Sequence, residues 1–186
     1  MTMKRVCNSY RLSSFSEKKG GIDMKMRIFG FAANSFVDGE GIRLAIFFQG
    51  CRRACPDCHN PGSWAMDGGV ETDTAVFEKM MLEDHLLDGV TFSGGEPFLQ
   101  IEPLIEMAKT ARTLGLDVWC WTGYRFEELL RSHDAMDALK YIDVLVDGPF
   151  EKDKRSLNLI WRGSTNQKII DVRKSLEKGE VVEYDY

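Results

Sequence analysis

Short β-rich runs alternate with amphipathic helical stretches along most of this 186-residue chain. Helical spacing of apolar residues is found over 72–87, where Thr72 is the expected N-cap, over 99–114 and over 125–131. The tail, residues 157–180, predicts one more short strand and a closing helix. The runs that predict strands are 27–33, 43–49, 89–93, 116–121 and 142–148. This alternation is typical of βα units, so we expect a largely parallel sheet.

The number of βα units limits the architecture. A complete eight-unit barrel takes about 250 residues, and this chain has too few units, so the expected fold class is α/β with an open, partial βα barrel. The length suits one domain with a sizeable core better than two. Residues 1–25 are polar, rich in Ser and Lys, and end near a Gly-Gly pair. We therefore expect a poorly ordered extension, followed by a single domain over 26–186.

Charge and hydropathy exclude several classes of partner. The formal net charge of −5 gives no basic surface for nucleic acid, and no run approaches the roughly 20 apolar residues that span a bilayer. The N-terminus lacks the apolar run of a secretory signal, so a cytoplasmic location is expected. In that reducing compartment cysteines are poor disulfide candidates. Cys7 and Cys120 are expected to be a tail thiol and a small buried hydrophobic residue, respectively.

Three further cysteines, Cys51, Cys55 and Cys58, lie together directly after the strand expected at 43–49. The carboxyl ends of strands are where parallel α/β folds hold their chemistry. Thiolates suit zinc or an iron–sulfur cluster. A structural zinc site needs four ligands; no second cysteine pair follows, and His59 is too close to Cys58 to share one ion easily. The spacing favours an iron–sulfur cluster with one iron open to a substrate, with zinc or inert thiols as alternatives.

The pattern Cys-x₃-Cys-x₂-Cys resembles the signature of the radical S-adenosylmethionine (SAM) enzymes. The resemblance implies that Cys51, Cys55 and Cys58 bind three irons of one [4Fe–4S] cluster, while SAM chelates the fourth iron. It also implies a partial barrel of the type found in that family. A second motif, SGGEP at 93–97, lies some 35 residues later and resembles the family segment that meets the amino group of SAM.

The residues of this second motif suit such a contact. Gly94 and Gly95 lack the β-carbon that would hold a ligand away from the backbone, and Glu96 offers a negative charge or a hydrogen-bond acceptor near a cationic ligand. Taken alone, the same letters are typical of a turn before a helix, whose first turn Pro97 would suit.

Two residues beside the last cysteine are candidates to contact the adenine of SAM. Many members of the family have an aromatic residue directly before the last cysteine, whereas this chain has Asp57, so a contact there would use the backbone. His59 is a candidate to stack on the base instead; the alternative is a loop histidine hydrogen-bonded to its neighbours. Asp147 and the segment 121–124 end strands that face the expected site and are weaker candidates, because turn chemistry explains them equally well.

Residues 36–64 resemble the opening of the glycyl-radical-enzyme activases, and 118–130, 141–150 and 156–172 are similar to the activators of anaerobic ribonucleoside-triphosphate reductases. This resemblance implies an enzyme that reductively cleaves SAM and takes a hydrogen atom from a glycine on the large subunit of the reductase. An electron donor such as flavodoxin or ferredoxin would be a second partner, with no nucleic acid or membrane involved. The alternatives are an activase of another glycyl radical enzyme, such as pyruvate formate-lyase, and a non-catalytic zinc or iron–sulfur module.

Overall fold

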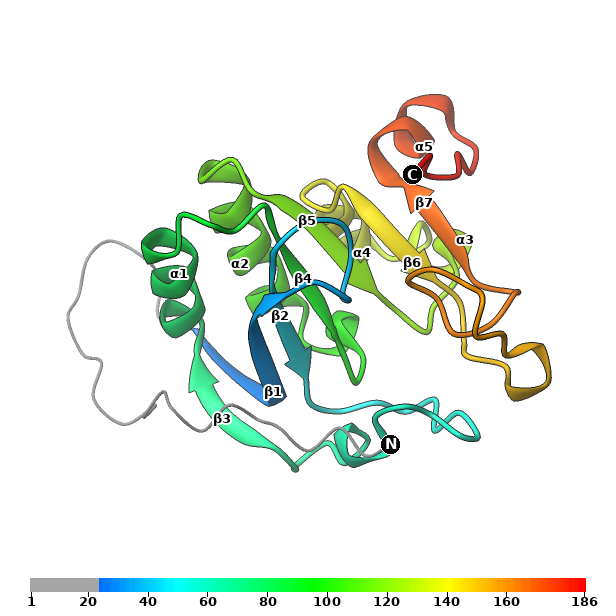
Figure 1. Ribbon diagram of the computed structural model, residues 1–186, viewed down its shortest axis with the longest axis horizontal. Coiled ribbons are helices and arrows are strands. Elements are labelled where there is room, and N and C mark those ends of the chain that lie inside the picture. The colour runs from blue at the N-terminus through cyan, green and yellow to red at the C-terminus, as the bar shows by residue number, and fades with distance from the viewer. Residues whose placement is uncertain (1–23) are drawn as a thin grey trace.

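A computed structural model describes residues 24–186 (Figure 1), so the expectations for Cys7 and for the N-terminal extension up to residue 23 lie outside the described residues. Within them, one open sheet has seven strands in the order β3-β1-β2-β4-β5-β6-β7. The strands are β1 (Lys25–Ser35), β2 (Arg43–Phe48), β3 (Val70–Asp73), β4 (Gly89–Gly94), β5 (Asp117–Trp121), β6 (Val144–Asp147) and β7 (Lys168–Asp171). The outer strands β3 and β7 are not paired with each other, so the sheet is not closed.

Helices connect these strands and complete the α/β fold. The α-helices are α1 (Thr74–Glu83), α2 (Ile101–Thr113), α3 (Phe126–Leu129), α4 (His133–Leu139) and α5 (Val172–Lys178). Short 3₁₀ turns lie at η1 (Pro61–Ser63), η2 (Pro97–Leu99) and η3 (Lys152–Lys154). The hydrophobic pattern of the sequence did not predict two of these elements, which are β3, with only four residues, and α4. The first helix is capped by Asp73, whose side chain accepts a hydrogen bond from the Ala75 amide, and not by Thr72, which belongs to β3.

Strand direction confirms the predicted parallel sheet only at its centre. Strands β2, β4, β5 and β6 are parallel to one another. Strand β1 is antiparallel to both β2 and β3, and β7 is antiparallel to β6. Residues 36–42 between β1 and β2 are too few for the crossover that parallel strands require. Residues 148–167 leave β6 and re-enter the sheet at the same edge, which reverses the direction of β7.

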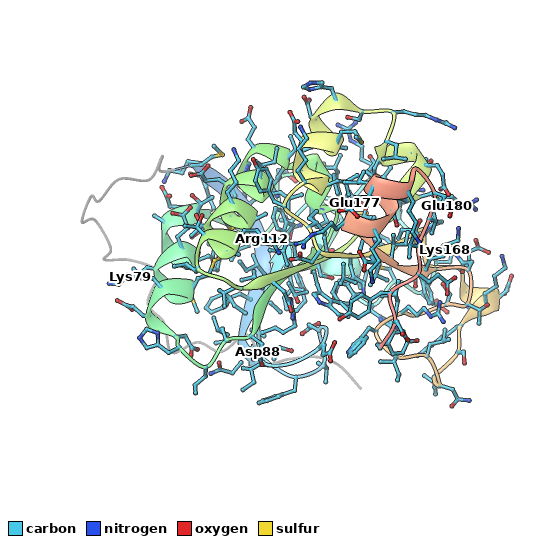
Figure 2. All side chains as sticks on the ribbon, turned by 90° about the horizontal axis from the view of Figure 1, so that it is seen from above. Lys79, Asp88, Arg112, Lys168, Glu177 and Glu180 are labelled. Atoms are coloured by element: carbon cyan, nitrogen blue, oxygen red, sulfur yellow. The ribbon has the colours of Figure 1, made fainter. Side chains whose placement is uncertain are left out.

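The two faces of the sheet carry different cores. Helices α1, α2 and α4 pack side by side on one face (Figure 1), and Figure 2 shows α1 and α2, marked by Lys79 and Arg112, as neighbours. Alternate residues of β5 point to opposite faces, so Cys120 joins the helix-covered core and Trp119 the other. The buried position of Cys120 confirms the expectation for that thiol. Among residues 24–186, no helix is long and apolar enough to cross a membrane.

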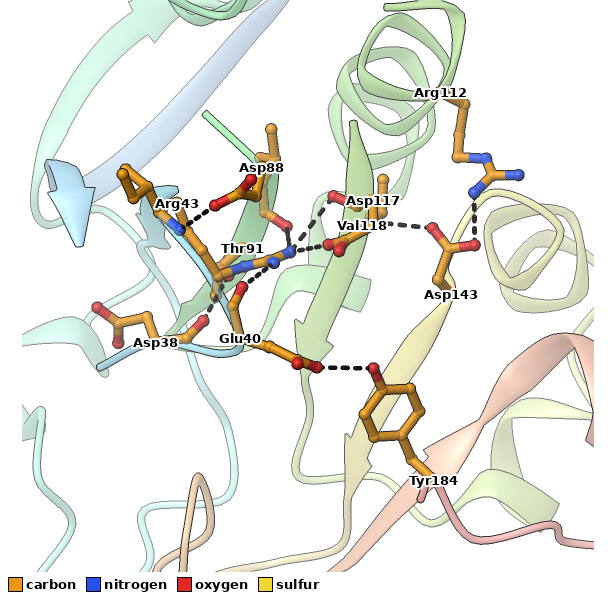
Figure 3. A network of polar contacts seen from close by, with 12 residues as sticks. Asp38, Glu40, Arg43, Asp88, Thr91, Arg112, Asp117, Val118, Asp143 and Tyr184 are labelled. Atoms are coloured by element: carbon orange, nitrogen blue, oxygen red, sulfur yellow. Dashed lines mark hydrogen bonds and ion pairs between the residues drawn. The ribbon is translucent and has the colours of Figure 1, made fainter. Parts of the chain in front are cut away.

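Arg43, at the start of β2, is fully buried at the amino edge of the parallel strands (Figure 3). Its Nε donates to Thr91 Oγ1 at 2.7 Å, and its Nη1 donates to the Glu40 carbonyl at 2.7 Å. Its Nη2 donates to the Val90 carbonyl at 2.9 Å and pairs with the Asp117 carboxylate. A buried guanidinium is tolerated only when its donors are matched in this way. The network joins the amino ends of β2, β4 and β5.

The last residues of the chain lie along β7 and the aromatic face. The Tyr184 amide donates to the Ile169 carbonyl at 2.8 Å, and Glu183 forms an antiparallel bridge with Ile170. The Tyr184 ring packs edge-on against Trp119, and its hydroxyl donates to the Glu40 carboxylate at 3.0 Å (Figure 3). The C-terminal segment therefore covers the outer edge of β7 and part of the face opposite α1, α2 and α4.

Candidate metal-cluster site

The three clustered cysteines lie on a loop whose ends are tied together. This cysteine loop, residues 51–64, follows β2 and lies at the carboxyl edge of the parallel strands, opposite the Arg43 network. The Gly50 amide donates to the Ser63 carbonyl at 2.7 Å, and the Cys51 amide donates to the Trp64 carbonyl at 3.1 Å. The buried side chain of Gln49 donates to the Ala65 carbonyl at 2.7 Å. These hydrogen bonds hold both ends of the loop in place.

Within the loop, Cys51, Cys55 and Cys58 are free thiols, all partly buried. The Cys58 amide donates to the Cys55 carbonyl at 3.1 Å, which closes a turn between these two ligand candidates. Ala54 and Asp57 have positive φ angles of 45° and 58°, so the backbone reverses direction before each of the last two cysteines. Burial raises the pKa of the Cys51 thiol, and bound iron would hold it as a thiolate.

The donor set fits a four-iron cluster better than a single ion. A structural zinc ion takes four protein ligands, whereas this loop offers three cysteines. A four-iron cluster takes one thiolate on each iron that the protein binds. Three thiols on one loop therefore match three irons of a cluster, and soft sulfur donors are the usual ligands of such clusters.

Gly94 and Gly95 pack against the start of the cysteine loop. Gly94 has a φ of +98°, and a β-carbon there would lie 2.7 Å from backbone atoms of Phe47 and Phe48. A β-carbon on Gly95 would lie 2.4 Å from the Gly50 carbonyl oxygen. The two glycines thus let the end of β4 and the cysteine loop touch backbone to backbone. The sequence suggested glycines for ligand approach; this backbone contact is a further reason for them.

Glu96 is buried just behind this contact, with only 2% of its surface exposed. Its carboxylate accepts hydrogen bonds from Thr122 Oγ1 at 2.8 Å, from the Gly123 amide at 2.8 Å and from the Phe98 amide at 3.2 Å. Burial outweighs these donors and raises the pKa of Glu96 to about 7. Glu96 therefore joins the β4–η2 turn to the β5–α3 connection, and segment 121–124 contributes to the site through Thr122 and Gly123.

Asp57 and His59 face the connection between β6 and β7. The Asp57 carboxylate forms an ion pair with Lys152 at 2.8 Å, and this contact lowers the pKa of Asp57. The His59 ring lies 5.7 Å from the Phe150 ring, tilted by 40°. Figure 1 shows the two segments, cyan and orange, at the same end of the molecule. Both side chains thus have protein partners that the sequence did not suggest.

Arg53 is a residue of the site that sequence reasoning missed. Its guanidinium lies 4.7 Å from the centre of the Tyr124 ring and forms an ion pair with Glu128 at 3.2 Å. A β-carbon on Gly123 would lie 2.5 Å from Arg53 Cδ, so the glycine leaves room for the arginine. Nothing in the local sequence signals a contact between residues 75 positions apart.

Asp147, a weaker candidate from the sequence, accepts hydrogen bonds from the Phe126 and Lys168 amides and so takes a structural role.

Comparison with known proteins places this geometry in a family. Residues 37–170 match the family described as a 4Fe-4S single cluster domain. Anaerobic ribonucleoside-triphosphate reductase-activating proteins are similar over most of their length. The protein from Haemophilus influenzae is 40% identical over 141 residues, which cover 70% of this chain and 88% of that relative. The protein of bacteriophage T4 is 38% identical, with 72% and 86% covered. The protein from Escherichia coli K12 is 34% identical, with 74% and 93% covered.

These relatives carry the name that the back half of the sequence suggested. The matched 4Fe-4S domain, residues 37–170, contains the cysteine loop, the glycine contact and the β6–β7 connection. The chain belongs to the family of anaerobic ribonucleoside-triphosphate reductase-activating proteins.

Proposed function

We propose that this protein activates an anaerobic ribonucleoside-triphosphate reductase by forming a glycyl radical on it. The observation that carries the proposal is the hydrogen-bonded loop with three thiols, which would leave one iron of a four-iron cluster without a protein ligand. When bound, the cluster and SAM supply one-electron reductive cleavage of a carbon–sulfur bond of SAM, which ends in removal of a hydrogen atom from a glycine of the reductase. The names of the relatives support the choice of reductase.

The residues of the chain have separate tasks in this proposal. Cys51, Cys55 and Cys58 hold three irons as thiolates. The backbone of Gly94 and Gly95 accepts the amino group of SAM, since Gly94 lies against the end of β2 and Gly95 against Gly50, directly before the cysteine loop. Glu96 lies directly behind them in a buried position, where its anionic form would favour a cationic ligand.

The adenine of SAM is proposed to lie beside the last cysteine. The His59 side chain is exposed, and its ring lies near the Phe150 ring. The adenine would stack on the imidazole of His59, next to the phenyl ring of Phe150. Asp57 would contribute through its backbone, because its carboxylate is engaged by Lys152. The Asp57 side chain would then hold the cysteine loop in place, and it would not contact the adenine.

The open sheet is proposed to be a partial barrel of the radical SAM type. Its outer strands β3 and β7 leave a side unpaired, and a protein loop that carries a glycine needs such an opening. Flavodoxin or ferredoxin is the expected electron donor, in a reducing cytoplasm where the thiols stay free for iron.

Anaerobic purification tests the cofactors directly. We expect a brown protein with about four irons per chain and a spectrum that shifts when SAM is added. Adding the cognate reductase, SAM and a reductant should give a glycyl radical signal by electron paramagnetic resonance and one 5′-deoxyadenosine per radical. A colourless zinc protein, or a radical formed on a pyruvate formate-lyase but not on the reductase, would refute the proposal.

A further inference from the structure

The connection between β6 and β7 is a built structure rather than a loose loop. Next to its tip, Arg155 and Ser164 form an antiparallel bridge, and the Thr165 amide donates to the Lys154 carbonyl at 2.9 Å. The buried side chain of Gln167 accepts from the Gly163 amide at 2.9 Å and donates to the Gly148 carbonyl at 3.0 Å. These contacts hold the two arms of the connection together and fix the direction of its tip.

The tip of this connection, residues 156–160, presents apolar side chains to solvent. Leu157 is 87% exposed, the largest value among the exposed large hydrophobic residues of the described chain, and Ile160 is 51% exposed. The next residue, Trp161, points the other way: its ring lies 4.9 Å from that of Trp119, and its carbonyl accepts from Trp121 Nε1 at 2.8 Å. The tip is therefore anchored on one side and leaves two aliphatic side chains uncovered on the other.

Two lysines of the connection form ion pairs within the protein. Lys152 pairs with Asp57 of the cysteine loop at 2.8 Å, and Lys154 pairs with Glu151 at 2.8 Å. At the tip, Leu157 and Ile160 are the exposed large hydrophobic side chains, and they offer a partner apolar contact. The same pair, Lys152 with Asp57, together with the contact between Phe150 and His59, places the connection directly beside the cysteine loop.

We propose that Leu157 and Ile160 form a docking contact for the reductase, and that they insert into an apolar pocket on the part of that protein that carries the glycine. The inference rests on the proposed function. A glycine held on a protein must be brought to the carboxyl edge of the sheet, and the protein that delivers it covers the surface next to the cysteine loop. Exposed aliphatic side chains on a rigid support are suited to such a contact, since burying them is favourable and little conformational freedom is lost.

The test uses the full chain with its cluster, SAM and the cognate reductase under anaerobic conditions. The variants are Leu157→Asp, Ile160→Asp and the pair together, and the matched control is Leu86→Asp. Leu86 is 68% exposed and lies between α1 and β4, at the amino edge of the parallel strands and away from the cysteine loop. Binding to the immobilised reductase and the yield of glycyl radical at limiting reductase are measured for each protein. Iron content and the slow cleavage of SAM without reductase report whether the site itself is intact.

Each aspartate at the tip should weaken binding to the reductase by roughly tenfold or more, and the pair by on the order of 100-fold. The radical yield should fall in step at low reductase concentration and recover at high concentration. Iron content and SAM cleavage without reductase should stay as in the unsubstituted protein, and Leu86→Asp should change nothing. If the doubly substituted protein binds and activates the reductase normally, the docking proposal is wrong while the proposed function stands. If the unsubstituted protein forms no glycyl radical, both fail.

Discussion

Gly95→Ala should separate the end of β4 from the cysteine loop. The backbone of Gly95 is outside the left-handed region, so alanine meets no conformational penalty there, and its cost comes from collision alone. The new β-carbon would lie 2.4 Å from the oxygen and 2.9 Å from the carbon of the Gly50 carbonyl. Ordinary contacts between such atoms are about 1 Å longer, and both partners are backbone. One of the two segments must therefore move.

This movement breaks a pair of hydrogen bonds at the contact. The Gly95 amide donates to the Phe48 carbonyl and the Glu96 amide to the Gly50 carbonyl, each at 2.8 Å. Leaving a buried donor without a partner costs roughly 1–3 kcal/mol, so the free energy of unfolding should fall by about 2–4 kcal/mol. Because Gly50 precedes Cys51, the displacement also moves the first ligand, and we expect less than half of the normal iron content.

Urea unfolding of the iron-free protein and iron analysis after anaerobic reconstitution measure the two effects. Gly115→Ala is the control, because its φ of +79° imposes a strain of about 1 kcal/mol while no atom lies within 4 Å of the added carbon. That variant should lose a little stability and keep all of its iron. If Gly95→Ala behaves like the control in both measurements, the backbone contact does not position the cysteine loop.

Other substitutions test the remaining parts of the structure. Cys55→Ala should abolish iron retention and 5′-deoxyadenosine formation, whereas Cys120→Ala should keep both and lose about 1 kcal/mol of stability from its buried position; equal losses would mean that the ligands are misassigned. The raised pKa of Glu96, about 7 against a usual 4.5, means that the folded protein binds this proton more tightly than the unfolded chain. Its stabilising contribution is thus complete below pH 4.5 and is lost as the pH rises to 7, so in urea unfolding of the iron-free proteins the parent should lose about 3 kcal/mol relative to Glu96→Gln between pH 4.5 and 8. A constant difference would contradict the burial of the charge. Arg43→Met should lower the free energy of unfolding by about 3 kcal/mol because it strands a carboxylate and several carbonyls. Arg112→Met, at a partly exposed ion pair with Asp143, should lower the free energy of unfolding by less than about 1 kcal/mol in the same assay. Similar losses for Arg43→Met and Arg112→Met would contradict the larger contribution expected of the buried arginine.

Features encoded in neighbouring residues could be predicted from the sequence. The strands at 89–94 and 117–121 follow from short apolar runs, and their parallel pairing follows from the helices between them. The cysteine loop could be predicted from the spacing of Cys51, Cys55 and Cys58 alone. The orientation of β1 could also have been read from the seven residues before β2, since so short a connection permits only an antiparallel pair.

The contacts that hold the candidate site depend on long-range folding and carry no local signal. Asp57 meets Lys152, and Arg53 meets Glu128, only because consecutive strands bring their carboxyl ends to one edge of the sheet. A charged side chain in a loop gives no indication of which distant residue will pair with it. The role of Glu96 was hidden for the same reason: its hydrogen-bond donors belong to the next connection along the sheet.

The C-terminal segment has a consequence for how this protein stays apart from its own copies. Strand β7 ends the sheet, and an uncovered end strand offers its amides and carbonyls to any other strand of matching length. Here the chain uses its own last residues for that purpose, with Val182 and Tyr184 bonded to Asp171 and Ile169. The C-terminal segment therefore occupies the edge through which β7 could pair with another strand. Two copies of the protein cannot join their sheets through β7 unless this segment first detaches.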